Sequence, residues 1–134
     1  MALTTKQKVI ALIQQKQRWP LLVVGLRADD FLHAVVIPST IAESELGVLP
    51  EINGYKYPKW LMSVLIKARE GKAITLCIDG IDELPCEQQA KFYGILQYKS
   101  LNGFQLPAQT QIIVTAQNLT KVAPQIKSMC LLVK

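Results

Sequence analysis

Short apolar runs alternate with longer amphipathic segments along this chain of 134 residues. The apolar runs are too short for helices and predict strands at residues 21–25, 33–37, 73–78, 111–116 and 129–133. The segments between them carry apolar residues at helical spacing and predict helices at residues 4–17, 58–70, 86–98 and 119–126. Strands that alternate with helices indicate an α/β fold, with a mostly parallel sheet flanked by helices on both faces.

Turn-forming and capping residues mark where these elements begin and end. Thr4 or Thr5 can cap the first helix with a side-chain oxygen. Pro58 fits the first turn of the second helix, and Gly71 should close that helix. Residues 39–57 contain Gly47, Pro50 and the Asn53-Gly54 pair, so we expect them to be mostly loop.

The chain is long enough for one domain with a single hydrophobic core. We expect one domain over residues 1–134, made of an N-terminal helix in residues 1–18 and a sheet core in residues 21–134. No apolar run approaches the roughly 20 residues that cross a bilayer, and no apolar segment of an export signal follows the N-terminus. We therefore expect a cytoplasmic protein without a membrane partner.

Residue types that bind metals or react in redox chemistry are few. The three cysteines, Cys77, Cys86 and Cys130, have the spacing of no zinc or redox motif. Cys77 belongs to an apolar run and is expected to be a small core residue. His33 has only apolar neighbours in the sequence, so we expect no metal or catalytic role for it.

The net charge of +5 is unevenly distributed along the chain. No acidic residue follows Glu87, whereas five lysines do. A basic surface can bind nucleic acid through phosphate contacts, and it can also be a solvated face or a docking surface for an acidic partner. The lysines are scattered and form no cluster with interleaved aromatic residues. Nucleic-acid binding is therefore an alternative, not the favoured function.

The most informative stretch is residues 74–85, where an apolar run delivers Asp79 to the expected end of a buried strand. Nucleotide hydrolases present a carboxylate to a metal ion in this way. Yet no segment has the form Gly, four residues, Gly-Lys-Ser/Thr, the backbone cradle that holds phosphates. Asp79 could instead accept amide hydrogen bonds at the strand end, and Asn118 could cap the short helix after its own strand.

In this order, the segments from about residue 34 onwards resemble the core of an AAA+ ATPase of the MoxR or dynein-like branch. Residues 76–85 are similar to the Walker B strand of that family, and residues 112–118 are similar to its sensor strand. Further similar segments are residues 34–37, 45–50, 57–61 and 103–107. The resemblance implies a P-loop-NTPase-like fold, with Asp79 at the metal-binding acid and Asn118 at the sensor position.

Several parts of the family pattern are missing. The first strand is soon followed by the second, which leaves no place for a phosphate loop and its helix. Gly80 replaces the glutamate that would polarise the attacking water, and Asp82 or Glu83 is a weak substitute. Residues 125–128 lack the arginine that would complete a neighbouring subunit's site. Phosphoryl transfer depends on such groups, and the arginine alone contributes roughly a thousandfold or more.

We therefore expect a reduced AAA+-like domain that needs no cofactor, is not an active ATPase and acts by binding protein. Its partner would be a genuine AAA+ ATPase, another protein or a second copy of the chain. One alternative is a protein that binds ATP with magnesium and hydrolyses it slowly, with the phosphates held by a non-standard loop at residues 25–30. The other alternative is a basic nucleic-acid-binding module.

Two structural expectations follow from the resemblance. Asp79 and Asn118 should face each other across neighbouring parallel strands, at the edge formed by the carboxyl ends of the strands. The missing helix would leave the sheet face beside residues 21–24 bare, and exposed apolar surface is unfavourable. The N-terminal helix is the expected cover, through Val9, Leu12 and Ile13.

Overall fold

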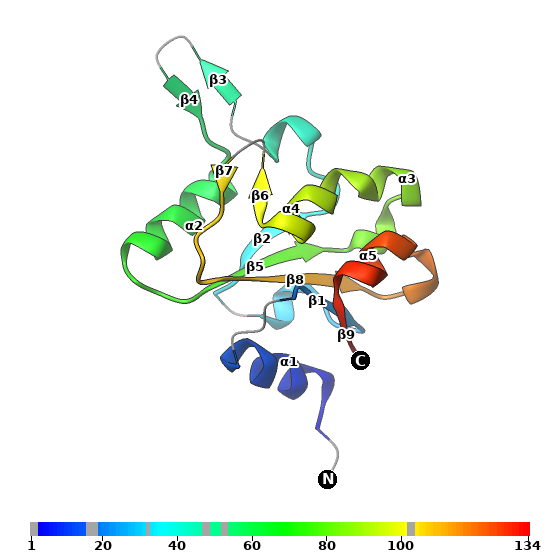
Figure 1. Cartoon of the computed structure of the whole chain (residues 1–134). Helices are drawn as coiled ribbons and strands as arrows, with labels where there is room; N and C mark the ends of the chain where they lie inside the picture. The colour runs from blue at the N-terminus through cyan, green and yellow to red at the C-terminus, as the bar shows by residue number, and fades with distance from the viewer. Residues whose placement is uncertain (1–2, 16–18, 32, 47–48, 52–53, 102–103) are drawn as a thin grey trace.

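The structure, a computed structural model, describes residues 3–15, 19–31, 33–46, 49–51, 54–101 and 104–134. Its centre is a five-stranded sheet with the strand order β2-β5-β8-β1-β9 (Figure 1). Every strand pairing in this sheet is parallel. The five strands are β1 (Leu21–Val24), β2 (Val35–Pro38), β5 (Ile74–Asp79), β8 (Thr110–Ala116) and β9 (Leu131–Val133). The prediction of an α/β fold with a mostly parallel sheet is confirmed.

Helices cover both faces of the sheet (Figure 1). On one face, α2 (Lys59–Arg69), α4 (Tyr93–Tyr98) and α5 (Pro124–Met129) pack on the larger of two hydrophobic clusters. On the other face, α1 (Thr5–Gln14) packs on the smaller cluster. Within the described ranges, no helix is both long and apolar enough to cross a membrane.

The N-terminal helix covers the sheet face beside β1. Thr4 and Gln7 form a capping box that fixes the start of α1. Val9 is fully buried in the same cluster as Leu21 and Val23 of β1, and Leu12 and Ile13 pack against that cluster. This placement confirms the expected cover. The predicted end of the helix falls partly on residues 16–18, which lie outside the described residues.

Four predicted elements differ from the structure. The predicted strand at residues 129–133 begins only at Leu131, because Met129 is the last residue of α5. Strand β2 begins at Val35 instead of His33, because His33 has a left-handed φ of 69° that no strand accommodates. The predicted helix at residues 86–98 is divided into α3 (Cys86–Gln89), a 3-10 turn η4 (Ala90–Phe92) and α4. The predicted helix at residues 119–126 is a 3-10 turn, η5 (Leu119–Lys121), followed by α5. Pro124 cannot donate a backbone hydrogen bond, so it begins α5 and does not sit inside a helix.

The connections between strands hold short elements that periodicity alone does not reveal. Residues 39–57, expected to be mostly loop, contain the 3-10 turn η2 (Glu43–Glu45) and a hairpin of β3 (Leu49–Glu51) and β4 (Gly54–Lys56). A second hairpin pairs β6 (Ser100–Leu101) with β7 (Phe104–Gln105). Two more 3-10 turns, η1 (Ala28–Asp30) and η3 (Ile81–Glu83), follow β1 and β5 at the carboxyl edge. Both of these turns border the candidate site.

Candidate functional site

A hollow of about 270 Å³ opens at the carboxyl edge of the sheet, where β1, β5 and β8 end. In open parallel α/β sheets, ligands usually bind at this edge. The hollow contains Asp79 but is not lined by Asn118. The residues that line it are Arg27, Asp79, Gly80, Asp82, Glu83, Thr115, Ala116, Gln117 and Lys121.

The Asp79 carboxylate binds other parts of the protein. Its Oδ1 atom accepts a hydrogen bond from the backbone N–H of Ala28 at 2.9 Å and another from the Thr115 hydroxyl at 2.8 Å. The Thr115 Oγ1 atom in turn accepts the N–H of Gly80 at 3.0 Å. This network joins the ends of β5 and β8 to the turn after β1. The sequence left two roles open for Asp79, a metal ligand or an acceptor of amide hydrogen bonds at the strand end. In the structure, Asp79 accepts such a hydrogen bond.

The turn after β1 uses most of its own backbone donors. Arg27 N–H donates to Asp30 Oδ2 at 2.9 Å, as Ala28 N–H does to Asp79. Gly25 N–H donates to the Ala116 carbonyl and Asp30 N–H to the Arg27 carbonyl, both at 3.0 Å. A phosphate bound here would compete with two carboxylates of the protein for the Arg27 and Ala28 amides. The turn therefore already binds two anionic groups, the carboxylates of Asp30 and Asp79.

Asn118 does not face Asp79, and this expectation was wrong. Strands β5 and β8 are parallel neighbours as predicted, with Ile78 paired to Val114. That register brings Asp79 against Thr115, three residues before Asn118. The Asn118 Oδ1 atom accepts hydrogen bonds from the N–H and the hydroxyl of Thr120, at 3.1 and 2.6 Å, and so caps η5.

Asp82 also ties this edge together. Its Oδ2 atom accepts the backbone N–H groups of Gln117 and Asn118 at 3.1 and 2.9 Å. The Gln117 side chain then donates to the Leu26 carbonyl at 3.0 Å. Asp82 therefore serves as an acceptor for the segment after β8, which makes it a poor replacement for a missing catalytic base.

Gly80 has a conformational reason to be glycine. Its φ is 75°, in the left-handed region that side chains rarely adopt. A Cβ atom at this position would lie 3.0 Å from the Glu83 side chain. A glutamate at residue 80 would therefore carry backbone strain and also crowd a second carboxylate. The backbone geometry of the β5–η3 connection therefore disfavours a glutamate at this position.

Acidic residues concentrate at this edge of the sheet. Eight of the ten acids lie at or soon after the carboxyl ends of β1, β2 and β5, namely Asp29, Asp30, Glu43, Glu45, Asp79, Asp82, Glu83 and Glu87. Only Arg27 and Lys121 contribute positive charge to the lining of the hollow. Among the described residues, no group of three His, Cys, Asp or Glu side chains is placed to hold a metal ion. The local field therefore disfavours a triphosphate.

The sequence analysis did not identify Thr115 and the Ala28 amide as partners of Asp79. The only signal for Thr115 is a hydroxyl inside an otherwise apolar strand, because a buried polar side chain needs a hydrogen-bond partner. No local signal identifies Ala28, since its role depends on the approach of a strand far along the chain. Cys77 and Cys130 do not line the hollow, and burial raises the pKa of each to about 12. The Asp79 charge adds to the rise at Cys77.

Comparisons with known proteins leave the family open. No protein-family model matches the chain, and a search of the curated proteins finds no match.

Proposed function

We propose that this chain is a reduced AAA+-like domain that does not hydrolyse ATP and that acts as a protein-docking module. The observation that carries the proposal is the hydrogen bond from the Ala28 amide to Asp79. Asp79 is the carboxylate that would bind the metal ion in an active ATPase, and here it binds a backbone amide of the protein itself. The parallel neighbours β5 and β8, with their polar carboxyl ends, support the AAA+-like part of the proposal. The left-handed Gly80 and the acidic edge support the lack of hydrolysis.

The alternative of a non-standard phosphate loop at residues 25–30 is weaker, because backbone amides of this turn already donate to groups of the protein. Phosphate-binding loops present free backbone N–H groups to the anion. Here the Arg27 and Ala28 amides donate to carboxylates, and the Gly25 and Asp30 amides donate to carbonyls. Binding a triphosphate would require breaking these bonds and bringing its charge next to several acids.

A docking surface fits the outer edge of the sheet. Among the described strands, β9 ends the strand order and has β1 as its single partner, so its other side could pair with another chain. A groove of about 450 Å³ runs between β9 and α1, and its residues are mostly apolar. The Leu131 and Leu132 side chains are both exposed there. A partner that adds a strand to this edge would bury both leucines. The candidate partners are an intact AAA+ ATPase and a second copy of the chain.

The docking proposal can be tested with matched surface variants. Co-expression with the AAA+ ATPases of the source organism, followed by size-exclusion chromatography, should give a complex or a defined oligomer of the chain. Leu132→Lys should abolish it, because a charge would replace the exposed leucine on the edge strand. Ile66→Lys, at an exposed position of α2, is the control and should leave it intact. A chain that stays monomeric with every ATPase, or a complex that survives Leu132→Lys, would refute docking at β9.

A further inference from the structure

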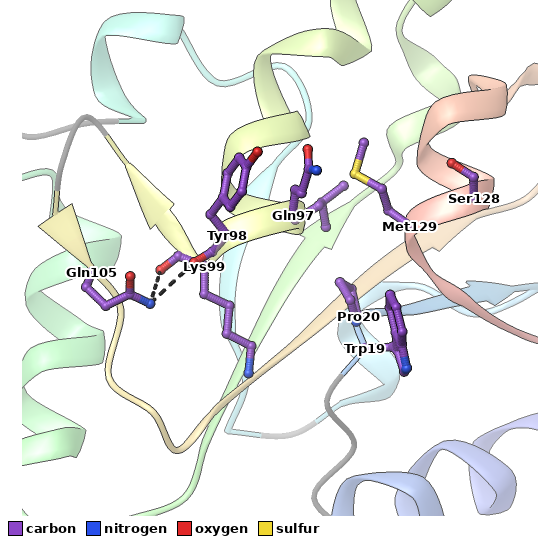
Figure 2. A pocket seen from close by; sticks show the side chains of 9 residues that line it. Trp19, Pro20, Gln97, Tyr98, Lys99, Gln105, Ser128 and Met129 are labelled. Carbon is purple, nitrogen blue, oxygen red and sulfur yellow. Dashed lines mark hydrogen bonds between the residues drawn. The ribbon is translucent and has the colours of Figure 1, made fainter.

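The amino edge of the sheet, opposite the acidic edge, carries two exposed aromatic rings on one hollow. The hollow has a volume of about 790 Å³ and is bordered by the start of β1, the end of α4, β7 and the end of α5 (Figure 2). Trp19 and Tyr98 both line it, and the two residues are 58% and 65% exposed. They are the two most exposed large hydrophobic side chains in the described part of the chain. Exposed apolar side chains that gather at one hollow are typical of interaction sites.

The backbone beneath each ring is fixed by hydrogen bonds. The Trp19 carbonyl accepts the Gln111 side-chain N–H at 3.1 Å, and the next carbonyl, that of Pro20, accepts the Leu131 N–H at 2.8 Å. The Tyr98 carbonyl accepts the Gln105 side-chain N–H at 3.3 Å. The backbone at both rings is therefore fixed, so a ligand that stacks there need not order the main chain.

The other exposed side chains of the hollow are polar. Gln97, Gln105 and Ser128 are exposed, whereas the aliphatic members are buried or half-buried. A surface for an apolar protein segment would expose aliphatic groups. Aromatic rings beside amide and hydroxyl groups instead suit nucleobases, which stack on rings and hydrogen-bond through their edges.

The charge of this edge suits a polyanion. None of the nine lining residues is acidic. Lys99 lies between Gln105 and Trp19 in Figure 2, and its ammonium uses one N–H to reach the Thr110 carbonyl at 3.0 Å. Lys127, next to Ser128, is exposed. Eight of the ten acids, which would repel phosphates, lie at the far edge of the sheet.

We propose that the hollow formed by Trp19, Tyr98 and Lys99 is a binding site for single-stranded nucleic acid. Bases stack on the two rings, and the lysines face the phosphates. The hollow is assembled from four separate segments, at the start of β1, the end of α4, β7 and the end of α5, so the sequence shows no basic cluster with interleaved aromatic residues. The site is independent of docking at β9, and each proposal can fail without the other.

The test uses a fluorescein-labelled oligothymidylate of about 15 nucleotides, at roughly 50 mM salt, with fluorescence anisotropy as the readout. The wild-type chain should bind it and prefer it to a duplex of the same length. Trp19→Ala and Tyr98→Ala should each weaken binding by at least about fivefold, because a base loses its stacking partner. Tyr98→Phe keeps the ring and should bind like the wild type. Thermal melting of each variant establishes that it is folded.

The contribution of the lysines to binding is tested with one variant and one control. Lys127→Ala should lower the slope of log affinity against log salt by about one, because one phosphate contact is lost. Lys59→Ala, at an exposed position where α2 begins, should not change it. The proposal is overturned by absence of binding, by a preference for duplex, or by folded Trp19→Ala and Tyr98→Ala variants that bind normally. Competition by free thymidine monophosphate at equal nucleotide concentration would also overturn it, since the hollow would then be a mononucleotide site.

Discussion

Val9→Asp should unfold the protein or abolish its cooperative melting, whereas Ile10→Asp should change the free energy of unfolding by no more than about 0.5 kcal/mol. The two residues are neighbours on α1, but Val9 is fully buried against β1 and Ile10 is 43% exposed. A carboxylate at Val9 would be buried without a partner, and this costs several kcal/mol. Domains are stable by only about 5–15 kcal/mol. Circular dichroism melting and size-exclusion chromatography would measure both variants.

Deletion of residues 1–18 tests the same role of α1 by another route. Removing the helix would uncover the apolar side chains of Leu21 and Val23, so the truncated chain should aggregate or melt without cooperativity. A truncated chain that is soluble, monomeric and as stable as the full chain would show that α1 is not the cover of this sheet face. Near-normal melting of Val9→Asp would lead to the same conclusion.

Asp79→Ala should lower the free energy of unfolding by about 2–4 kcal/mol, because two hydrogen bonds to a charged acceptor are lost. The Ala28 amide and the Thr115 hydroxyl would both lose the acceptor that joins η1 and β8 to β5. Any trace hydrolysis of ATP should be the same in the variant and in the wild type. Urea unfolding and a phosphate-release assay would measure these two quantities.

Asp29→Ala is the matched control for Asp79→Ala. Asp29 is an exposed acid on η1, one residue after Ala28, and its removal should leave stability within about 0.5 kcal/mol. If Asp79→Ala abolished a measurable ATPase activity while the protein stayed stable, Asp79 would be a working metal ligand. The proposed structural role of Asp79 would then be wrong.

The sequence predicted those parts of the fold that depend on local pattern. The apolar runs that became β5 and β8 are buried along nearly their whole length, so their identity as strands followed from composition. Gly71, with a φ of 72°, closes α2 as expected. The hairpin of β3 and β4 was missed, because its strands are too short for a period to show.

The candidate site was only half predictable. Asp79 could be placed at the carboxyl edge, because the end of an apolar run fixes where its strand ends. Its partner could not be predicted, since the pairing with Thr115 depends on the register between β5 and β8. The two rings of the amino edge, Trp19 and Tyr98, come together only in the folded chain and gave no signal in the sequence.

The most direct test of the account is a titration of the ¹⁵N-labelled protein with ATP and magnesium, followed by the backbone amide NMR signals of residues 25–30. These signals report whether the Arg27 and Ala28 amides stay bound to Asp30 and Asp79. We predict no saturable shift of these signals up to about 1 mM ATP, because the Arg27 and Ala28 amides already donate to carboxylates. A Kd of about 1 mM would require about 4 kcal/mol of binding free energy. Saturable shifts at Arg27 and Ala28 with micromolar affinity would contradict the account, because the turn would then hold phosphate.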